Sequence, residues 1–358
     1  MLSRVLTLCL AAVPLYCADT AGRVLAEIQR VQQSLKDRPI TDPNFPAVVA
    51  NVTERSKSAA DAASAGRLFV SLERLGQAVD TLNGARAAID LGPTAGASLA
   101  AFEVEWAKVS AERSAFRKQQ EQHRWMGPAA IRALAEAAEG RTGPLLDGAR
   151  GFAVSAKPGD GLFYLGEVRG QMQFAQFSAR VEMARRGPAT PLRSYAPELE
   201  ALQQKVNAAF VPPRSIEQHP IFIAMNSALK LARELDASRR YAGALYQYLE
   251  ATRMFNMLDA APVDAAAQSG LRNAIEDARA ELAEAPQDDS IALLFFERAS
   301  IQSKHPDGSE PSADEWRAVS AIARSVLPAY RAAMKPSTVF KAPKGKTVEV
   351  TLVRWPYT

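Results

Sequence analysis

The chain has 358 residues, and its 43 Lys or Arg against 39 Asp or Glu give a formal net charge of +4 at pH 7. Hydrophobic residues at 47% and charged residues at 23% are typical of a globular protein and exclude a disordered chain. Acidic and basic residues are interleaved, so the sequence lacks the basic stripe with aromatic residues that nucleic-acid binding calls for. We therefore expect no nucleic-acid partner. The abundance of Ala and Arg, with little Ile or Thr, favours helix over strand.

The first 18 residues have the pattern of an export signal. Arg4 supplies a positive charge, residues 5–13 form an apolar run, and Pro14 ends that run shortly before polar residues begin. The run is shorter than the roughly 20 residues that a membrane-spanning helix needs, and no later segment reaches that length. We expect a signal peptide over 1–18 and an exported protein, periplasmic or extracellular, with no transmembrane segment. A buried N-terminal helix is the alternative.

Both cysteines, Cys9 and Cys17, lie in this leader. A lipid anchor on Cys17 is an alternative to cleavage, but the bulky Tyr16 and the position of Leu15 do not fit a lipoprotein signal. The mature chain therefore forms no internal disulfide, and packing must hold its fold together. The three histidines lie too far apart in sequence to predict a metal site, and we expect neither a metal nor a cofactor.

Beyond the leader, apolar residues recur at helical spacing, and Pro and Gly separate one helix from the next. The sequence predicts long helices over about 47–65, 95–126, 161–186 and 195–210, among others. Glycine and proline interrupt residues 129–156, where we expect short helical pieces and a hinge or subdomain boundary. Ser215–Gln218 and Ser312–Glu315 have the spacing of helix-starting capping boxes.

The predicted organisation has five regions. They are the signal peptide 1–18, an N-terminal helical region 19–139, a glycine- and proline-interrupted middle 140–192 with one long helix, a C-terminal helical-hairpin region 193–336, and a basic tail 337–358.

The tail departs from the helical pattern. Residues 347–353 alternate and are rich in β-branched side chains, which predicts a strand that pairs with 337–341. The expected fold class is therefore all-α, with antiparallel helical hairpins as a repeat array or an irregular bundle, plus a short C-terminal β-hairpin. Because an isolated hairpin is marginal in water, it needs a surface to lie on. Its own helices or a second subunit are the two choices, and the second implies oligomerisation.

Two segments of the chain are similar to one another. Residues 68–77 and 162–171 share Leu-Phe, then Glu, then Gly-Gln. In each segment a small residue, Gly76 or Gly170, would let a neighbouring helix approach closely.

Residues 225–258 resemble a tetratricopeptide repeat, a 34-residue helical hairpin. Leu231 and Ala232 match the first helix of that family, while Ala228 and Asn256 depart from its pattern. The second helix is matched by Tyr241, Ala244, Tyr248 and Ala251, and a weaker unit follows with Ala278, Leu282 and Ala285. The resemblance implies helical hairpins whose first helices line a concave binding face. Carried over to this chain, it nominates as partner-binding residues Asn226, Arg233 and Asp236, with solvation as the alternative role.

No catalytic motif is present. The chain has no His-x-x-x-His, no Gly-x-Ser-x-Gly and no phosphate-binding glycine loop. His123 lies near Glu121 and Trp125, but no nucleophile accompanies it, and a helix-end or packing role fits better. We therefore expect no catalytic residue and a non-enzymatic, exported helical scaffold that binds a protein or peptide in the cell envelope. The alternatives are an envelope enzyme with an Asp/Glu pair assembled across helices, and a structural module that oligomerises through the C-terminal hairpin.

Overall fold

The computed structural model describes residues 3–92, 98–155, 157–181, 183–185, 187–189, 191–209, 218–305 and 308–335, without side chains before residue 20. Every regular element in these ranges is a helix, which confirms the all-α class. None of the described helices is long and apolar enough to cross a bilayer.

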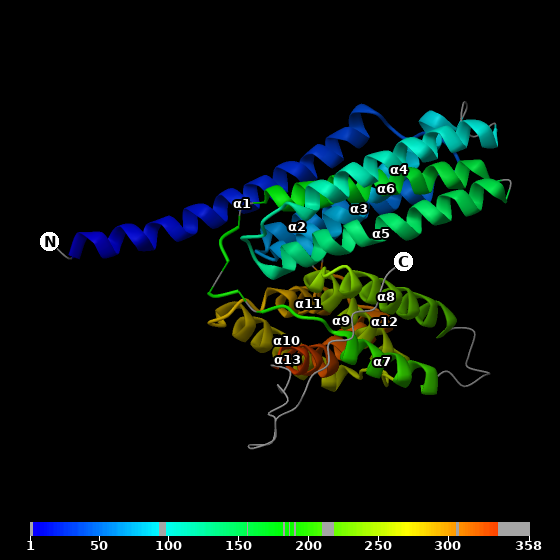
Figure 1. The fold of residues 1–358 in the computed structure, drawn as a ribbon. Coiled ribbons are helices and arrows are strands. Elements are labelled where there is room, and N and C mark those ends of the chain that lie inside the picture. The colour runs from blue at the N-terminus through cyan, green and yellow to red at the C-terminus, as the bar shows by residue number, and fades with distance from the viewer. Residues whose placement is uncertain are drawn as a thin grey trace, which may run out of the picture.

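The helices form two layers (Figure 1). The first layer comprises α1 (Ser3–Asp37), α2 (Pro46–Ser64), α3 (Leu68–Leu91), α4 (Leu99–Glu121), α5 (Ala129–Val154) and α6 (Pro158–Arg180). The second comprises α7 (Ala196–Ala209), α8 (His219–Ala237), α9 (Tyr241–Leu258), α10 (Ala265–Glu284), α11 (Ser290–Ser303), α12 (Ala313–Ala321), the π-helical η2 (Ile322–Val326) and α13 (Leu327–Met334). The layers meet where α5 packs on α8 and α9, and where α3 and α5 pack on α11. The beginning of α1 extends beyond the other helices.

The predicted fold class included a C-terminal β-hairpin, and this part of it is wrong. No strand occurs among the residues that the structure describes. The segment expected to form it, 337–358, lies outside those residues. Alternation of β-branched residues is a weak signal by itself, since strand preference depends mainly on the surface against which a strand packs.

The predicted break in the middle of the chain is also wrong. Helix α5 runs without interruption from Ala129 to Val154 and contains Pro144. Gly140 serves packing between helices, because a Cβ there would lie 2.8 Å from the Cδ1 atom of Leu231 on α8. Sequence reasoning treated the glycines of α5 as helix breakers, whereas tertiary contacts on several sides of α5 outweigh their low helix propensity.

Close packing of α3 against α6 confirms the role predicted for the paired glycines. The two similar segments, 68–77 and 162–171, lie on these two helices. A Cβ on Gly170 would lie 2.4 Å from the Cα atom of Asp80, and a Cβ on Gly76 would lie 3.0 Å from the Phe174 ring. Neither position has room for a larger side chain without a shift of its neighbours.

The segment that resembles a tetratricopeptide repeat forms the antiparallel hairpin α8–α9. Ala232, Ala244 and Ala251 are fully buried, and Leu235 packs beside them. A three-residue connection, 238–240, joins the helices, with Arg239 in the left-handed region at φ 61°. This all-helical packing is compatible with a helical-repeat-like fold.

Carboxylates of one layer cap helix starts in the other. Glu297 of α11 accepts hydrogen bonds from the backbone N–H groups of Phe69 (3.1 Å) and Val70 (3.2 Å) at the start of α3. Glu136 of α5 accepts one from Gly243 (2.8 Å) at the start of α9. Such bonds satisfy backbone donors that a helix leaves free at its start. They fix how the two layers sit on one another.

The predicted capping box at Ser312 is confirmed. The Ser312 hydroxyl accepts a hydrogen bond from the Glu315 backbone N–H at 3.2 Å, and the Glu315 carboxylate accepts one from the Ser312 N–H at 2.8 Å. The second box, Ser215–Gln218, falls largely outside the described residues.

Candidate functional site

A cavity lies between the two layers. It has a volume of about 690 Å³ and is lined from α3, α5 and α6 on one side and from α8, α9 and α11 on the other. We call it the interlayer cleft. Its charged lining residues are Glu73, Arg74, Asp80, Arg141, Glu167, Lys230, Glu234, Glu250, Arg253 and Arg298.

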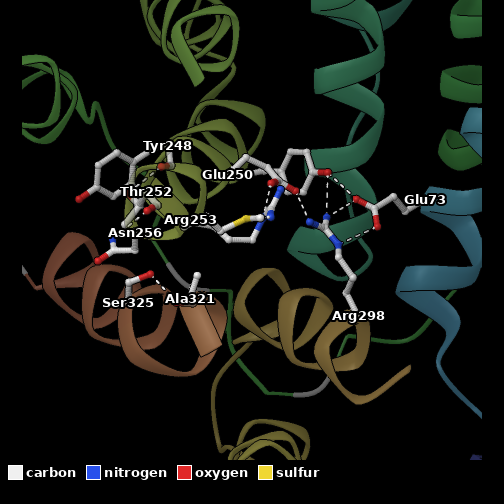
Figure 2. Close-up of polar contacts among 11 residues, drawn as sticks. Glu73, Tyr248, Glu250, Thr252, Arg253, Asn256, Arg298, Ala321 and Ser325 are labelled. Atoms are coloured by element: carbon white, nitrogen blue, oxygen red, sulfur yellow. Dashed lines mark hydrogen bonds and ion pairs between the residues drawn. The ribbon is translucent and has the colours of Figure 1, made fainter. Parts of the chain in front are cut away.

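A buried ion network lines part of the interlayer cleft. Figure 2 shows Arg298 of α11 between Glu73 of α3 and Glu250 of α9. Its guanidinium forms ion pairs with both carboxylates, including an Nε contact of 3.1 Å to Glu73. The Tyr246 hydroxyl donates to Glu73 at 2.6 Å, and Arg253 donates to Glu250 at 2.9 Å.

The network is electrostatically matched. Burial alone would raise the pKa of Glu250, but Arg298 and Arg253 outweigh it and lower that pKa to about 2. Burial would likewise lower the pKa of Arg298, and Glu250 and Glu73 raise it well above its ordinary value. These residues therefore stay charged and paired. Their role is to join α3, α9 and α11 rather than to react.

Two further carboxyl groups in the cleft are not neutralised in this way. Burial raises the pKa of Asp80 to about 6 against the opposing charge of Arg141. Burial, together with the charge of Asp80, raises the pKa of Glu167 to about 7. Asp80 accepts a hydrogen bond from the Gln171 amide at 2.5 Å. Both carboxyl groups therefore exchange protons near neutral pH.

Three buried polar atoms in the cleft have no hydrogen-bond partner among the described residues. They are Nε of Arg74, Nε2 of Gln247 and Oε1 of Gln302. Gln247 is only 4% exposed, so water does not cover its side chain freely. An unsatisfied buried polar group costs about 1–3 kcal/mol, and native proteins keep few of them. These three atoms make the interlayer cleft a candidate binding surface.

The residues nominated from the tetratricopeptide resemblance lie on another face of α8. Asn226 donates to the carbonyl of Phe222 in its own helix at 2.9 Å. Arg233 lies 3.9 Å from a Glu200 carboxylate oxygen. Asp236 accepts from the Tyr195 backbone N–H at 2.7 Å, just before α7 begins. None of the three nominated residues lines the interlayer cleft.

Two of the histidines, His123 and His305, have structural surroundings. The His123 ring meets Trp125 edge-on at a centroid distance of 4.6 Å. His305 lies 2.7 Å from the Ser309 hydroxyl and 2.9 Å from the Glu315 carboxylate. That Ser–His–Glu order resembles a catalytic triad in outline, but the same Glu315 already caps α12 through Ser312. We therefore assign the group to the chain turn that precedes α12.

Sequence reasoning missed the cleft because its residues come from helices far apart in the chain. One local signal was present: charged residues occupy positions where the helical spacing predicts core. Glu73 lies between the fully buried Leu72 and Leu75, and Glu297 and Arg298 follow the fully buried Phe295 and Phe296. A charge at a core position marks a buried partner on another helix.

No family model matches the chain, and neither the curated proteins nor the solved structures compared with it give a match. The class that the structure itself defines is an all-α protein of packed helical hairpins with a polar interhelical cleft.

Proposed function

We propose that the protein is an exported, non-enzymatic helical scaffold that binds an extended peptide segment of a protein partner in the interlayer cleft. The observation that carries this proposal is the pair of amide side chains, Gln247 and Gln302, that line the cleft without a hydrogen-bond partner among the described residues. A primary amide both donates and accepts, as does the peptide group that would pair with it.

The dimensions of the cleft support the same occupant. A volume of about 690 Å³ lies within the usual range of ligand-binding pockets, about 300–1,000 Å³. The exposed residues Ala224 and Ser227 of α8 form part of its wall.

The tetratricopeptide resemblance enters the proposal through α8. In that family the first helix of each hairpin faces the bound peptide, and α8 is the first helix of the hairpin here. The strip of α8 that we assign to binding is the one that lines the cleft: Ala224, Ser227, Lys230 and Glu234. It replaces Asn226, Arg233 and Asp236 as the binding strip in this proposal.

Export is the second part of the proposal. The leader pattern over 1–18 falls on the part of α1 that extends beyond the other helices (Figure 1). Removal of that part would leave the buried residues Val24, Ile28 and Val31 to pack α1 on the bundle. Amino-terminal sequencing of the protein produced in a secreting host should show that the leader, residues 1–18, has been removed. A mature chain that still begins at Met1 would refute this part.

Selection from a random peptide library displayed on phage tests the binding proposal. The mature protein should enrich peptides, and Ala224→Trp, which fills the cleft from its wall, should abolish the enrichment. Ala266→Trp places the same indole on an exposed position of α10 and should select the same peptides as the unmodified protein. Equal enrichment by Ala224→Trp, or none by the unmodified protein, would sink the proposal.

The raised pKa values of Asp80 and Glu167 favour a second candidate, an envelope enzyme with an acid–base pair. Two carboxyl groups that titrate near neutrality in one cavity are suited to proton transfer. The discriminating assay measures release of soluble fragments from a cell-wall preparation. An enzyme loses this release in both Asp80→Asn and Glu167→Gln. The binding proposal expects no release by the unmodified protein.

A further inference from the structure

We propose that Arg74 and Arg141 form a carboxylate-binding subsite in the interlayer cleft, so that the peptide it takes is acidic. This inference rests on the proposed function and names the chemistry of its ligand.

Arg74 is a cation without a partner among the described residues. Its Nε atom is buried and unpaired, and no described residue forms an ion pair with its guanidinium. The adjacent Glu73 is already engaged by Arg298 and Tyr246. Burial lowers the pKa of Arg74, and the charges of Arg298 and Arg55 lower it further while Glu73 opposes them. An incoming anion would supply the charge that this environment lacks.

Arg141 of α5 faces the same space and also makes no hydrogen bond or ion pair with a described residue. It lines the cleft together with Asp80 of α3 and Tyr246 of α9, and its charge acts on both. Asp80 does not neutralise it fully, because burial keeps the pKa of that carboxyl at about 6.

Among the described residues, carboxylates pair with the other positively charged residues of the cleft, but not with these two arginines. Arg298 and Arg253 are matched by Glu73 and Glu250, and Lys230 lies 3.9 Å from Glu234. The remaining charged lining residues are Arg74, Arg141, Asp80 and Glu167, and the two carboxyl groups have pKa values of about 6 and 7. When those two carboxyl groups take up protons, the lining carries two uncompensated positive charges.

Guanidinium groups bind carboxylate and phosphate with paired N–H donors. The free amides of Gln247 and Gln302 line the same cleft and suit a neighbouring peptide group. A carboxylate carried on a peptide uses both features, whereas a free phosphate uses only the arginines. The combination therefore favours an acidic peptide.

Fluorescence anisotropy with a labelled hexaglutamate peptide tests the inference, with hexaglutamine as the neutral probe and inorganic phosphate as competitor. Hexaglutamate should bind at least about ten-fold more tightly than hexaglutamine, since a hydrogen bond to a charged group contributes about 1.5–3 kcal/mol. Arg74→Met and Arg141→Met should each lower the hexaglutamate affinity about ten-fold or more. Arg324→Met changes an exposed arginine of η2 outside the cleft and should leave it unchanged.

Circular dichroism of each variant establishes that it is folded before titration. Equal affinity for the two peptides, or a folded Arg74→Met that binds hexaglutamate like the unmodified protein, would overturn the subsite. Displacement of the peptide by phosphate at equal or lower concentration would overturn the assignment to carboxylate. The phage selection distinguishes failure of this inference from failure of the proposed function. Enrichment of neutral peptides refutes only the acidic ligand, while no enrichment refutes the binding proposal itself.

Discussion

Arg298 on α11 forms a buried ion pair with Glu73 on α3, although 225 residues separate them in the chain. The pair joins the two helical layers (Figure 2) and lines the interlayer cleft. Glu250 of α9 forms a second ion pair with Arg298. The same cleft therefore contains arginines that are matched and arginines that are not, and this contrast allows structural and binding roles to be separated by experiment.

Replacement of Arg298 by methionine should destabilise the protein by about 3–5 kcal/mol, because it removes the guanidinium that pairs with two buried carboxylates. Glu73 would keep only the Tyr246 hydroxyl, and Glu250 would keep only Arg253. Urea unfolding followed by circular dichroism measures the loss. The triple variant with Glu73→Gln and Glu250→Gln removes the stranded charges and should recover part of the stability. A loss below about 1 kcal/mol for Arg298→Met would contradict the role assigned to the network.

Close packing of α3 on α6 predicts that Gly170→Ala is destabilising by about 1–3 kcal/mol, since the added methyl would overlap the α3 backbone at Asp80. Gly151→Ala is the matched control in another helix, because a Cβ there meets nothing within 4 Å. That control should be neutral or stabilise by up to about 1 kcal/mol. Thermal denaturation of both variants checks the difference, and equal melting temperatures would disprove the tight approach.

The raised pKa of Glu297 predicts that the free energy of unfolding depends on pH. Burial raises its pKa to about 8, although Val70 and Phe69 donate hydrogen bonds to it and Arg67 is near. The folded state therefore holds this proton more tightly than the unfolded state. The resulting stabilisation is fully present below the ordinary glutamate pKa and is lost as pH rises through about 8.

Glu297→Gln removes this pH dependence while it keeps an oxygen that can accept from the start of α3. Relative to the unmodified protein, the variant should gain stability as pH rises from 6 towards 8, by about 1.4 kcal/mol for each pH unit. Urea unfolding across that range measures the difference. Glu284→Gln, on the exposed side of α10, is the control and should run parallel to the unmodified protein. A constant difference between the Glu297→Gln and unmodified curves would count against the raised pKa.

Binding of the hexaglutamate probe should strengthen as pH falls from 8 to 5.5. Asp80 and Glu167, with pKa values of about 6 and 7, take up protons over this range and stop repelling the acidic peptide. The variant Asp80→Asn/Glu167→Gln should bind more tightly at pH 8 and lose most of this pH dependence. Anisotropy titrations at several pH values provide the measurement, and the same slope in both proteins would rule out these carboxyl groups as its source.

The sequence was informative wherever structure depends on neighbours within a few turns of helix. Helical spacing predicted the all-α fold, the capping box at Ser312 followed from hydroxyl chemistry, and Gly76 and Gly170 marked close helix contacts. Local rules misjudged α5, because contacts with α8 and other helices hold its glycines and Pro144 in one helix. They also suggested a β-hairpin from alternation alone.

The cleft could not be predicted in this way. Glu73, Glu250 and Arg298 meet only after the layers assemble, and each looks like an ordinary charged residue in its own helix. The missing information was which buried faces oppose each other. Charges at core positions show that a buried partner exists, but they do not identify that partner.

The central claim is that the unpaired polar groups of the cleft bind a ligand and do not stabilise the fold. The most direct measurement is the free energy of unfolding of ligand-free Arg74→Met in urea. Because the Arg74 Nε atom is buried and unpaired, its removal should raise that free energy by about 1 kcal/mol, in contrast to the large loss expected for Arg298→Met. A loss of more than about 1 kcal/mol in Arg74→Met would show that Arg74 holds the fold together and would contradict the account.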